Sequence, residues 1–213
     1  MADEDGQPRS LSSLKIISGG QSGAELGALR AAKCVGLATG GVMPPRFTNE
    51  HGANPSFRAC YGVRESVHAN LDDAFTECAK ANIDAADATI LFRFSPTPQL
   101  DYAITYAQEG AWRRGMPLGI LAQRQSPVVN TRPDRVVTLV NGRQPVLVIV
   151  RAHTTDIAWL VNCIVNFVRD YDLRTLNVTG HRDSSAPCAD FEAAVFTILS
   201  AAFSHLQRHP KSR

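Results

Sequence analysis

The sequence predicts an α/β protein with a Rossmann-like three-layer fold and a mainly parallel sheet. Two observations and one general rule support this prediction. Short apolar runs alternate with segments of helical periodicity along most of the chain. Glycine-containing turns connect several of these runs to the helix that follows. Strands that alternate with helices pair in parallel and carry helices on both faces of the sheet.

The first elements are the most clearly marked. Residues 14–17 are apolar and form the first expected strand. Residues 22–35 carry apolar side chains at helical spacing, and Gly36 provides a stop, so we expect a helix there. Residues 37–43 form a second apolar strand that ends at two prolines.

A long polar segment follows, and then regular alternation resumes. Residues 46–65 contain glycines and prolines without clean periodicity, which predicts a functional loop or a lid. We expect a helix over 67–83, an apolar strand over 88–94, a helix over 100–114 that stops at a glycine, and a strand over 117–121.

The last third contains a hairpin signal. Residues 135–140 and 145–150 are β-branched runs on either side of Asn141-Gly142, which predicts a tight β-hairpin. Residues 122–153, which include this hairpin, are an expected insertion.

The chain then returns to the alternating pattern. Thr154 or Thr155 is the expected cap of a helix that runs to about residue 169. A strand over 173–178, a loop over 179–187 and a final helix over 190–206 complete the prediction. The apolar face of that helix is wide enough for the core or for a homo-oligomer contact, and we expect it to face the core.

The bulk properties fit one domain. The chain has 213 residues, so residues 13–207 form a single expected domain between a disordered leader (1–12) and a frayed basic tail (208–213). A net charge of +2 does not favour nucleic acid or a membrane surface, and no apolar run has the length of a membrane helix.

Cysteine usage indicates an intracellular, cytoplasmic protein. The five cysteines are dispersed, their number is odd, and no secretory signal precedes them. None has the spacing of zinc ligands, so we expect no metal site.

The turn after the first strand is the best candidate binding site. It comprises Gly19, Gly20, Gln21, Ser22 and Gly23. Glycines let a backbone approach an anion closely, and unpaired N–H groups at a helix N-terminus attract phosphate. We therefore expect the turn to bind an anionic small molecule, with Ser22 capping the helix or bonding the ligand. The alternative is a turn that only packs helix against strand.

A second polar stretch follows the strand at 173–178. It offers Asn177, Gly180, Arg182 and Ser184 as ligand contacts, because arginine suits bidentate recognition of phosphate or carboxylate. The alternative is a polar loop with a helix cap.

Three further groups are candidates for ligand binding or acid–base chemistry. Arg46 and His51 lie in the long polar segment, where they could close over a ligand. Glu109 shares a predicted helix with Asp101, but two turns separate them, which is too far for a paired carboxylate dyad. Exposed loop and helix-face groups are the alternative interpretation for all three.

Several stretches together resemble one family. These are Gly-Gly-Gln-Ser-Gly-Ala-Glu (19–25), Met-Pro-Pro-Arg (43–46), Glu-His-Gly (50–52), Tyr-Gly-Val-Arg-Glu (61–65), Asn82 with Asp-Ala-Thr-Ile-Leu (87–91), and Leu-Asn-Val-Thr-Gly-His-Arg-Asp-Ser (176–184). In this order they resemble motifs of the putative molybdenum (molybdenum-cofactor) carrier family, a circularly permuted branch of the Rossmann-like superfamily that contains the Lonely-guy and DprA-like (SLOG) proteins. The resemblance spans about residues 14–206.

The chain departs from the pattern of that family at several positions. Glu25 replaces an aspartate, His51 replaces an aspartate, and Cys78-Ala79 replaces an Arg-Thr pair. The Gly-Gly-Thr turn expected after the fourth strand is absent, since residues 95–106 contain no glycine. In related phosphoribohydrolases that turn helps to hold phosphate and leads to a catalytic glutamate.

Three functions remain open at this point. The first is a binding protein for a nucleotide, a nucleotide derivative or, as the resemblance implies, the molybdenum cofactor. Arg46 and Arg182 would then clamp the anionic groups of the ligand. The second is a hydrolase that cleaves an N-glycosidic or phosphate-ester bond of a nucleotide, with Glu25, Glu109 or His51 as acid or base. The third is a non-catalytic scaffold.

Overall fold

The central sheet of the computed structural model is mainly parallel. The structure describes residues 14–68, 70–94, 97–109, 135–140, 144–150, 156–186 and 190–209. Its main sheet has the spatial order β2 (Ala38–Gly40), β1 (Lys15–Ile17), β10 (Thr175–Gly180), β7 (Ala88–Arg93), β9 (Val146–Val150) and β8 (Arg135–Leu139). All neighbours pair in parallel except β8 and β9, which form the expected antiparallel hairpin.

The strand order resembles that of a dinucleotide-binding fold, except that β10, the last strand in the sequence, occupies the position of the first strand of that fold. If β10 is counted as strand 1, then β1, β2 and β7 become strands 2, 3 and 4, and the order begins 3-2-1-4. The order reverses between β10 and β7. Open α/β sheets bind ligands outside the carboxyl ends of the strands at such a reversal.

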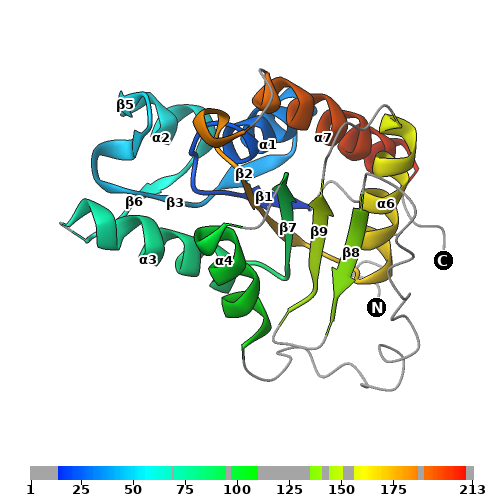
Figure 1. The fold of residues 1–213 in the computed structure, drawn as a ribbon. Coiled ribbons are helices and arrows are strands. Elements are labelled where there is room, and N and C mark those ends of the chain that lie inside the picture. Colours follow the sequence, from blue (N-terminus) through cyan, green and yellow to red (C-terminus); the bar gives the residue numbers. More distant parts are fainter. Residues whose placement is uncertain are drawn as a thin grey trace, which may run out of the picture.

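Helices cover both faces of the sheet (Figure 1). The helices α1 (Ala24–Cys34), α6 (Ile157–Asp170) and α7 (Phe191–Arg208) pack on one face, and α3 (Leu71–Asp84) and α4 (Pro98–Gln108) pack on the other. Along β7, Ile90 and Phe92 pack in the hydrophobic core between the sheet and α1, α6 and α7. Leu91 packs in the core between the sheet and α3 and α4. This alternation produces three layers, which confirms the predicted fold class.

The final helix packs in the core, as expected. Phe191, Val195, Ile198, Leu199 and Phe203 are completely buried between α7, α1 and the sheet. Within the described residues, no helix combines the length and the apolar character that a membrane crossing needs.

The polar segment at 46–65 is folded, so the expectation of a loop is wrong. It contains a 3-10 helix (Pro45–Phe47), a small hairpin of β4 (Thr48–Asn49) and β5 (Gly52–Ala53), the helix α2 (Ser56–Tyr61), and β6 (Arg64–Glu65), which pairs with β3 (Val42–Met43). Phe47 and Phe57 are buried against Leu29 and Met43. These scattered aromatic residues anchor the segment on α1 without regular spacing.

Two local predictions also change. The expected strand at 37–43 divides at Gly41, so that β2 stays in the main sheet and β3 leaves it. The cap of α6 is Asp156, whose carboxylate accepts the Trp159 N–H at 2.8 Å, rather than a threonine.

Other expectations lie outside the described residues. These are the leader at 1–12, the strand at 117–121, the Asn141-Gly142 turn, most of the insertion at 122–153 and residues 210–213 of the tail.

Candidate functional site

A pocket of about 680 Å³ lies at the carboxyl ends of β1, β10 and β7. Four parts of the chain form its walls, with Pro44 beside them. They are the turn after β1 with the start of α1 (Gly19, Gln21, Glu25), the end of β10 with the turn after it (Thr179–Arg182, Ser184, Ser185), one face of α3 (Phe75, Thr76, Cys78, Ala79, Asn82) and the start of α4 (Thr97–Leu100, Tyr102, Ala103). This volume lies within the range of pockets for small molecules. The pocket occupies the position that the strand order favours.

Glu25 projects from the first turn of α1 into this site. One carboxylate oxygen accepts the Gln21 N–H at 3.0 Å, and the other accepts the Thr179 hydroxyl at 2.8 Å. Burial raises the pKa of Glu25, while these two hydrogen bonds and the charge of Arg182 partly oppose that increase. The pocket therefore holds a carboxyl group that is biased toward its protonated form.

The N-terminus of α1 is less open than the sequence suggested. The Ala24 N–H donates to the His181 carbonyl at 3.1 Å, and the Leu26 N–H donates to the Gln21 carbonyl at 2.9 Å. Together with the Gln21 N–H, three groups that we expected to be free are thus paired with protein acceptors. Gly23, not Ser22, is the N-cap residue of α1.

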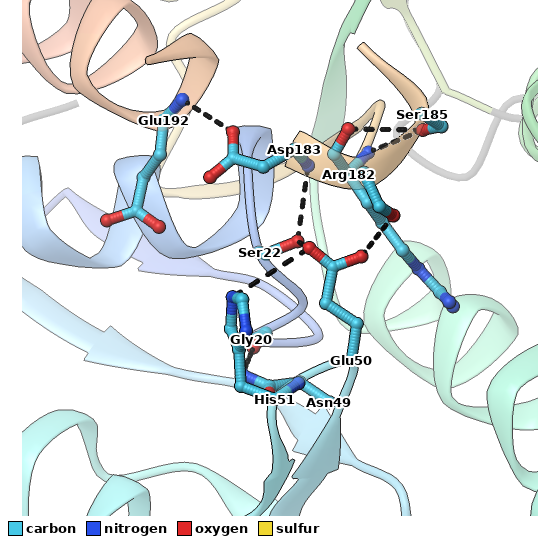
Figure 2. A network of polar contacts seen from close by, with 10 residues as sticks. Gly20, Ser22, Asn49, Glu50, His51, Arg182, Asp183, Ser185 and Glu192 are labelled. Atoms are coloured by element: carbon cyan, nitrogen blue, oxygen red, sulfur yellow. Dashed lines mark hydrogen bonds and ion pairs between the residues drawn. The ribbon is translucent and has the colours of Figure 1, made fainter. Parts of the chain in front are cut away.

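Ser22 instead belongs to a polar network with Glu50 (Figure 2). The buried Ser22 hydroxyl donates to Glu50 and accepts the Asp183 N–H at 3.2 Å. The Ser184 hydroxyl donates to the other oxygen of Glu50. Burial favours a higher pKa for Glu50, but the hydrogen bonds from Ser184 and Ser22 outweigh it and hold the pKa below its ordinary value.

Arg182 provides the positive charge of the pocket. Its guanidinium carbon lies 4.8 Å from the centre of the Phe75 ring, which is a cation–π geometry. Figure 2 shows its side chain extending toward α3, away from Glu50. The Phe75 ring thus orients a group that can bind phosphate or carboxylate through two parallel hydrogen bonds.

His181 is a pocket residue that we did not single out from the sequence. It is 4% exposed, and its Nδ1 accepts the Phe94 N–H at 3.2 Å. Burial lowers its pKa, and the charge of Arg93 adds to this effect. The neutral ring therefore carries its hydrogen on Nε2 and adds a donor to the pocket wall. Phe75 and Tyr102 were missed because on helices they are typical core or surface residues, and Asn82 was named only as part of a family motif.

Seven predicted site residues do not line the pocket. Arg46 is exposed, and its N–H donates to Glu65. His51 is exposed next to Glu50, Glu109 is exposed at the C-terminus of α4, and Asn177 is buried between strands, where it donates to Thr89 at 3.3 Å. Gly20, Ser22 and Gly23 support the turn without lining the pocket. The predicted residues that line it are Gly19, Gln21, Glu25, Gly180, Arg182 and Ser184.

The buried amide of Gln21 is incompletely paired. Its Nε2 donates to the Thr48 carbonyl at 3.1 Å, whereas its Oε1 has no hydrogen-bond partner among the described residues. Its burial makes an unpaired oxygen costly, so the amide is a site that a ligand or a water could stabilise. In the described part of the chain, no group of three or more His, Cys, Asp or Glu side chains has the arrangement of a metal site.

Comparisons with known proteins identify a family and agree with the fold. The model of the circularly permutated YpsA SLOG family matches residues 16–131, more than half of the chain. A solved structure, that of a putative molybdenum carrier protein from Syntrophus aciditrophicus SB, is similar with a TM-score of 0.61 and 17% sequence identity over 92% of this chain and 96% of that one. At this identity the likeness concerns the fold. No curated relative matches.

Proposed function

We propose that this chain, which belongs to the circularly permutated YpsA SLOG family, binds a small anionic molecule in the pocket at the carboxyl ends of β1, β10 and β7. The ligand class is a nucleotide, a nucleotide derivative or a phosphorylated cofactor. The observation that carries the proposal is Arg182, which places a permanent positive charge in a pocket of ligand size.

The rest of the pocket suits a planar ring attached to that anion. Phe75 and Tyr102 supply aromatic surface, and Tyr102 is 40% exposed. Gln21, Asn82 and His181 add polar groups to the wall. Apolar walls with a few polar groups fix the orientation of a small ligand.

The fit to a molybdenum cofactor can be judged from the same residues. Arg182 and Ser185 would hold the phosphate of such a cofactor, and Phe75 would face its ring system. Burial raises the pKa of Cys78 to about 11, so this thiol is protonated and is a poor metal ligand. The pocket therefore suits the organic, phosphorylated part of the cofactor better than a bare metal ion.

A thermal-shift screen tests the proposal. Nucleoside mono- and diphosphates, cytokinin-type ribotides and molybdopterin analogues would be added to the wild-type protein and to Arg182→Ala, with Arg58→Ala as an exposed control outside the pocket. Binding to the folded state raises the melting temperature. We expect one ligand class to raise the melting temperature of the wild-type protein. Arg182→Ala should lose this increase, and Arg58→Ala should retain it. No shift with any compound would contradict the proposal and favour a scaffold.

A second candidate is a hydrolase that cleaves an N-glycosidic bond. Glu25 favours it, because a pocket carboxyl group with a raised pKa is suited to act as a general acid. The discriminating variant is Glu25→Gln. If the protein is a hydrolase, this variant should lose turnover and keep its affinity for the substrate. If the protein only binds its ligand, neither wild type nor the variant shows turnover. Release of free base from each ligand that binds is the measurement.

A further inference from the structure

The carboxylate of Glu50 sits among donors from two strand ends. Glu50 lies between β4 and β5, and the hydroxyls that donate to it come from Ser22, after β1, and from Ser184, after β10. The Ser184 backbone N–H also stabilises the negative charge of Glu50. These donors converge on one anionic group at the edge of the pocket, because Ser184 also lines the pocket.

We propose that Ser22 and Ser184 form an oxyanion subsite for a second phosphoryl group of the ligand, and that Glu50 occupies this subsite as an internal substitute until the ligand displaces it. This inference rests on the proposed function, because Arg182 would hold the first phosphoryl group. The proposed ligand class is then restricted to compounds with two adjacent phosphoryl groups, such as a nucleoside diphosphate.

The relative positions of Arg182 and Ser184 support a diphosphate. They lie two residues apart on the turn after β10. The Arg182 guanidinium group extends toward α3 (Figure 2), where it lies over Phe75, and the Ser184 hydroxyl donates to Glu50. Phosphoryl and carboxylate oxygens accept the same hydrogen bonds from hydroxyl and N–H donors. A chain of two phosphoryl groups could therefore contact both parts of the turn.

The subsite does not depend on Glu50 for its shape. Ser22 keeps the Asp183 N–H as a partner, and the Asp183 carboxylate is engaged with the Glu192 N–H at 3.0 Å. The hairpin backbone is held separately, since its Thr48 carbonyl accepts from Gln21. His51 Nε2 lies 3.8 Å from the Glu50 oxygen that accepts from Ser22, so a second partner for the carboxylate borders the subsite.

Calorimetry with inorganic pyrophosphate tests this inference on the full chain. The series comprises wild type, Glu50→Gln and Glu50→Ala, with Glu77→Gln as a control that removes the same charge from the surface of α3. We expect Glu50→Ala to bind pyrophosphate about tenfold more tightly than wild type, equivalent to about 1.4 kcal/mol. Glu50→Gln, which retains part of the contact, should be intermediate, and Glu77→Gln should match wild type.

The serines provide the decisive comparison. Adding Ser22→Ala and Ser184→Ala to Glu50→Ala should remove the gain. If the gain persists without the serines, or if neither Glu50 variant binds more tightly, the subsite does not exist. Circular dichroism identifies a variant that is unfolded, and Glu50→Gln keeps the test decisive if Glu50→Ala does not fold.

The two proposals fail separately. Nucleotide binding that depends on Arg182, without a gain in pyrophosphate affinity in either Glu50 variant, would retain the proposed function and overturn the subsite. A pyrophosphate gain that depends on the serines, in a protein that binds no nucleotide or cofactor analogue, would retain the subsite and overturn the proposed function.

Discussion

The carboxylate of Glu25 lies where a side chain at position 19 would be. A Cβ atom added to Gly19 would come within 2.6 Å of Glu25 Oε2, closer than any unstrained contact allows. The glycine after β1 therefore makes room for a carboxylate of the protein itself. Gly19 thus accommodates Glu25, whereas the sequence suggested that this glycine lets the backbone approach a phosphate closely.

We predict that Gly19→Ala destabilises the protein by about 1–3 kcal/mol, because displacement of Glu25 leaves the Gln21 N–H without its partner. Chemical denaturation of the single and double variants measures this cost. In a Glu25→Ala background the same change should be nearly neutral, since the clash is gone. Equal costs in the two backgrounds would show that the carboxylate is not the reason for the glycine.

The fold could be predicted because its signals are local and periodic. The strands β1 and β7 are mainly apolar, β10 alternates apolar with polar residues, and α1 and α7 have apolar faces. The strand order could not be predicted, because nothing in the sequence states that β10 pairs between β1 and β7. The folded segment at 46–65 depends on the burial of Phe47 and Phe57, which have no regular spacing.

The site could be predicted where a residue directly follows a strand. Gly19, Gln21 and Arg182 reach the pocket for this reason, and Gly180 reaches it as the last residue of β10. Asn177 does not, because β10 extends to Gly180 and leaves Asn177 in mid-strand, where it points between strands.

Glu109 is excluded by helix length. Ala103 is the last residue of α4 that lines the pocket, and Glu109 follows six residues later, about 9 Å further along the helix axis. The network around Glu50 depends on contacts between residues far apart in the sequence, which no local pattern predicts.

Glu25 should make stability depend on pH. Burial raises its pKa, so the folded protein retains this proton to a higher pH than the unfolded chain does. The stabilisation by the protonated form is complete below the ordinary value of 4.5 and decreases as the pH rises through the folded-state pKa. Glu25→Gln has no such proton. As the pH rises above 4.5, the free energy of unfolding of the variant should therefore increase relative to that of wild type.

Urea denaturation of both proteins between pH 4 and pH 8 measures this difference. The other titrating groups, including Glu50 with its lowered pKa, are present in both proteins, so their contributions largely cancel. A difference that stays constant with pH would show that Glu25 titrates normally. A constant offset is expected in addition to the pH-dependent part, because an amide replaces only part of the hydrogen bonding of the carboxylate.

Cys78 should be unreactive although it lines the pocket. It is 3% exposed, and burial raises its pKa to about 11, whereas Cys34 and Cys60 are exposed. Thiolate is the reactive form. Alkylation with iodoacetamide at pH 8, followed by peptide mass spectrometry, should label Cys34 and Cys60 and leave Cys78 unmodified until denaturant is added. Early labelling of Cys78 would show that the pocket opens in solution.

Asn82 should hold β3 beside the pocket. Its Oδ1 accepts the Val42 N–H at 2.8 Å, and its Nδ2 donates to the Val42 carbonyl at 3.0 Å, so one side chain replaces a strand neighbour for Val42. Asn82 is 3% exposed, and its loss would leave both Val42 groups unpaired. We predict that Asn82→Ala costs about 1–3 kcal/mol and increases amide hydrogen exchange at Val42.

Asn54→Ala is the matched control, because Asn54 also accepts a backbone N–H, that of Ser56, but at an exposed site where water can replace it. Its cost should stay below that of Asn82→Ala, and exchange at Val42 should not change. Asn82→Asp provides a sharper test: it keeps the acceptor for the Val42 N–H but places an oxygen against the Val42 carbonyl. It should therefore be no more stable than Asn82→Ala at neutral pH, and wild-type stability in Asn82→Asp would show that Nδ2 contributes nothing.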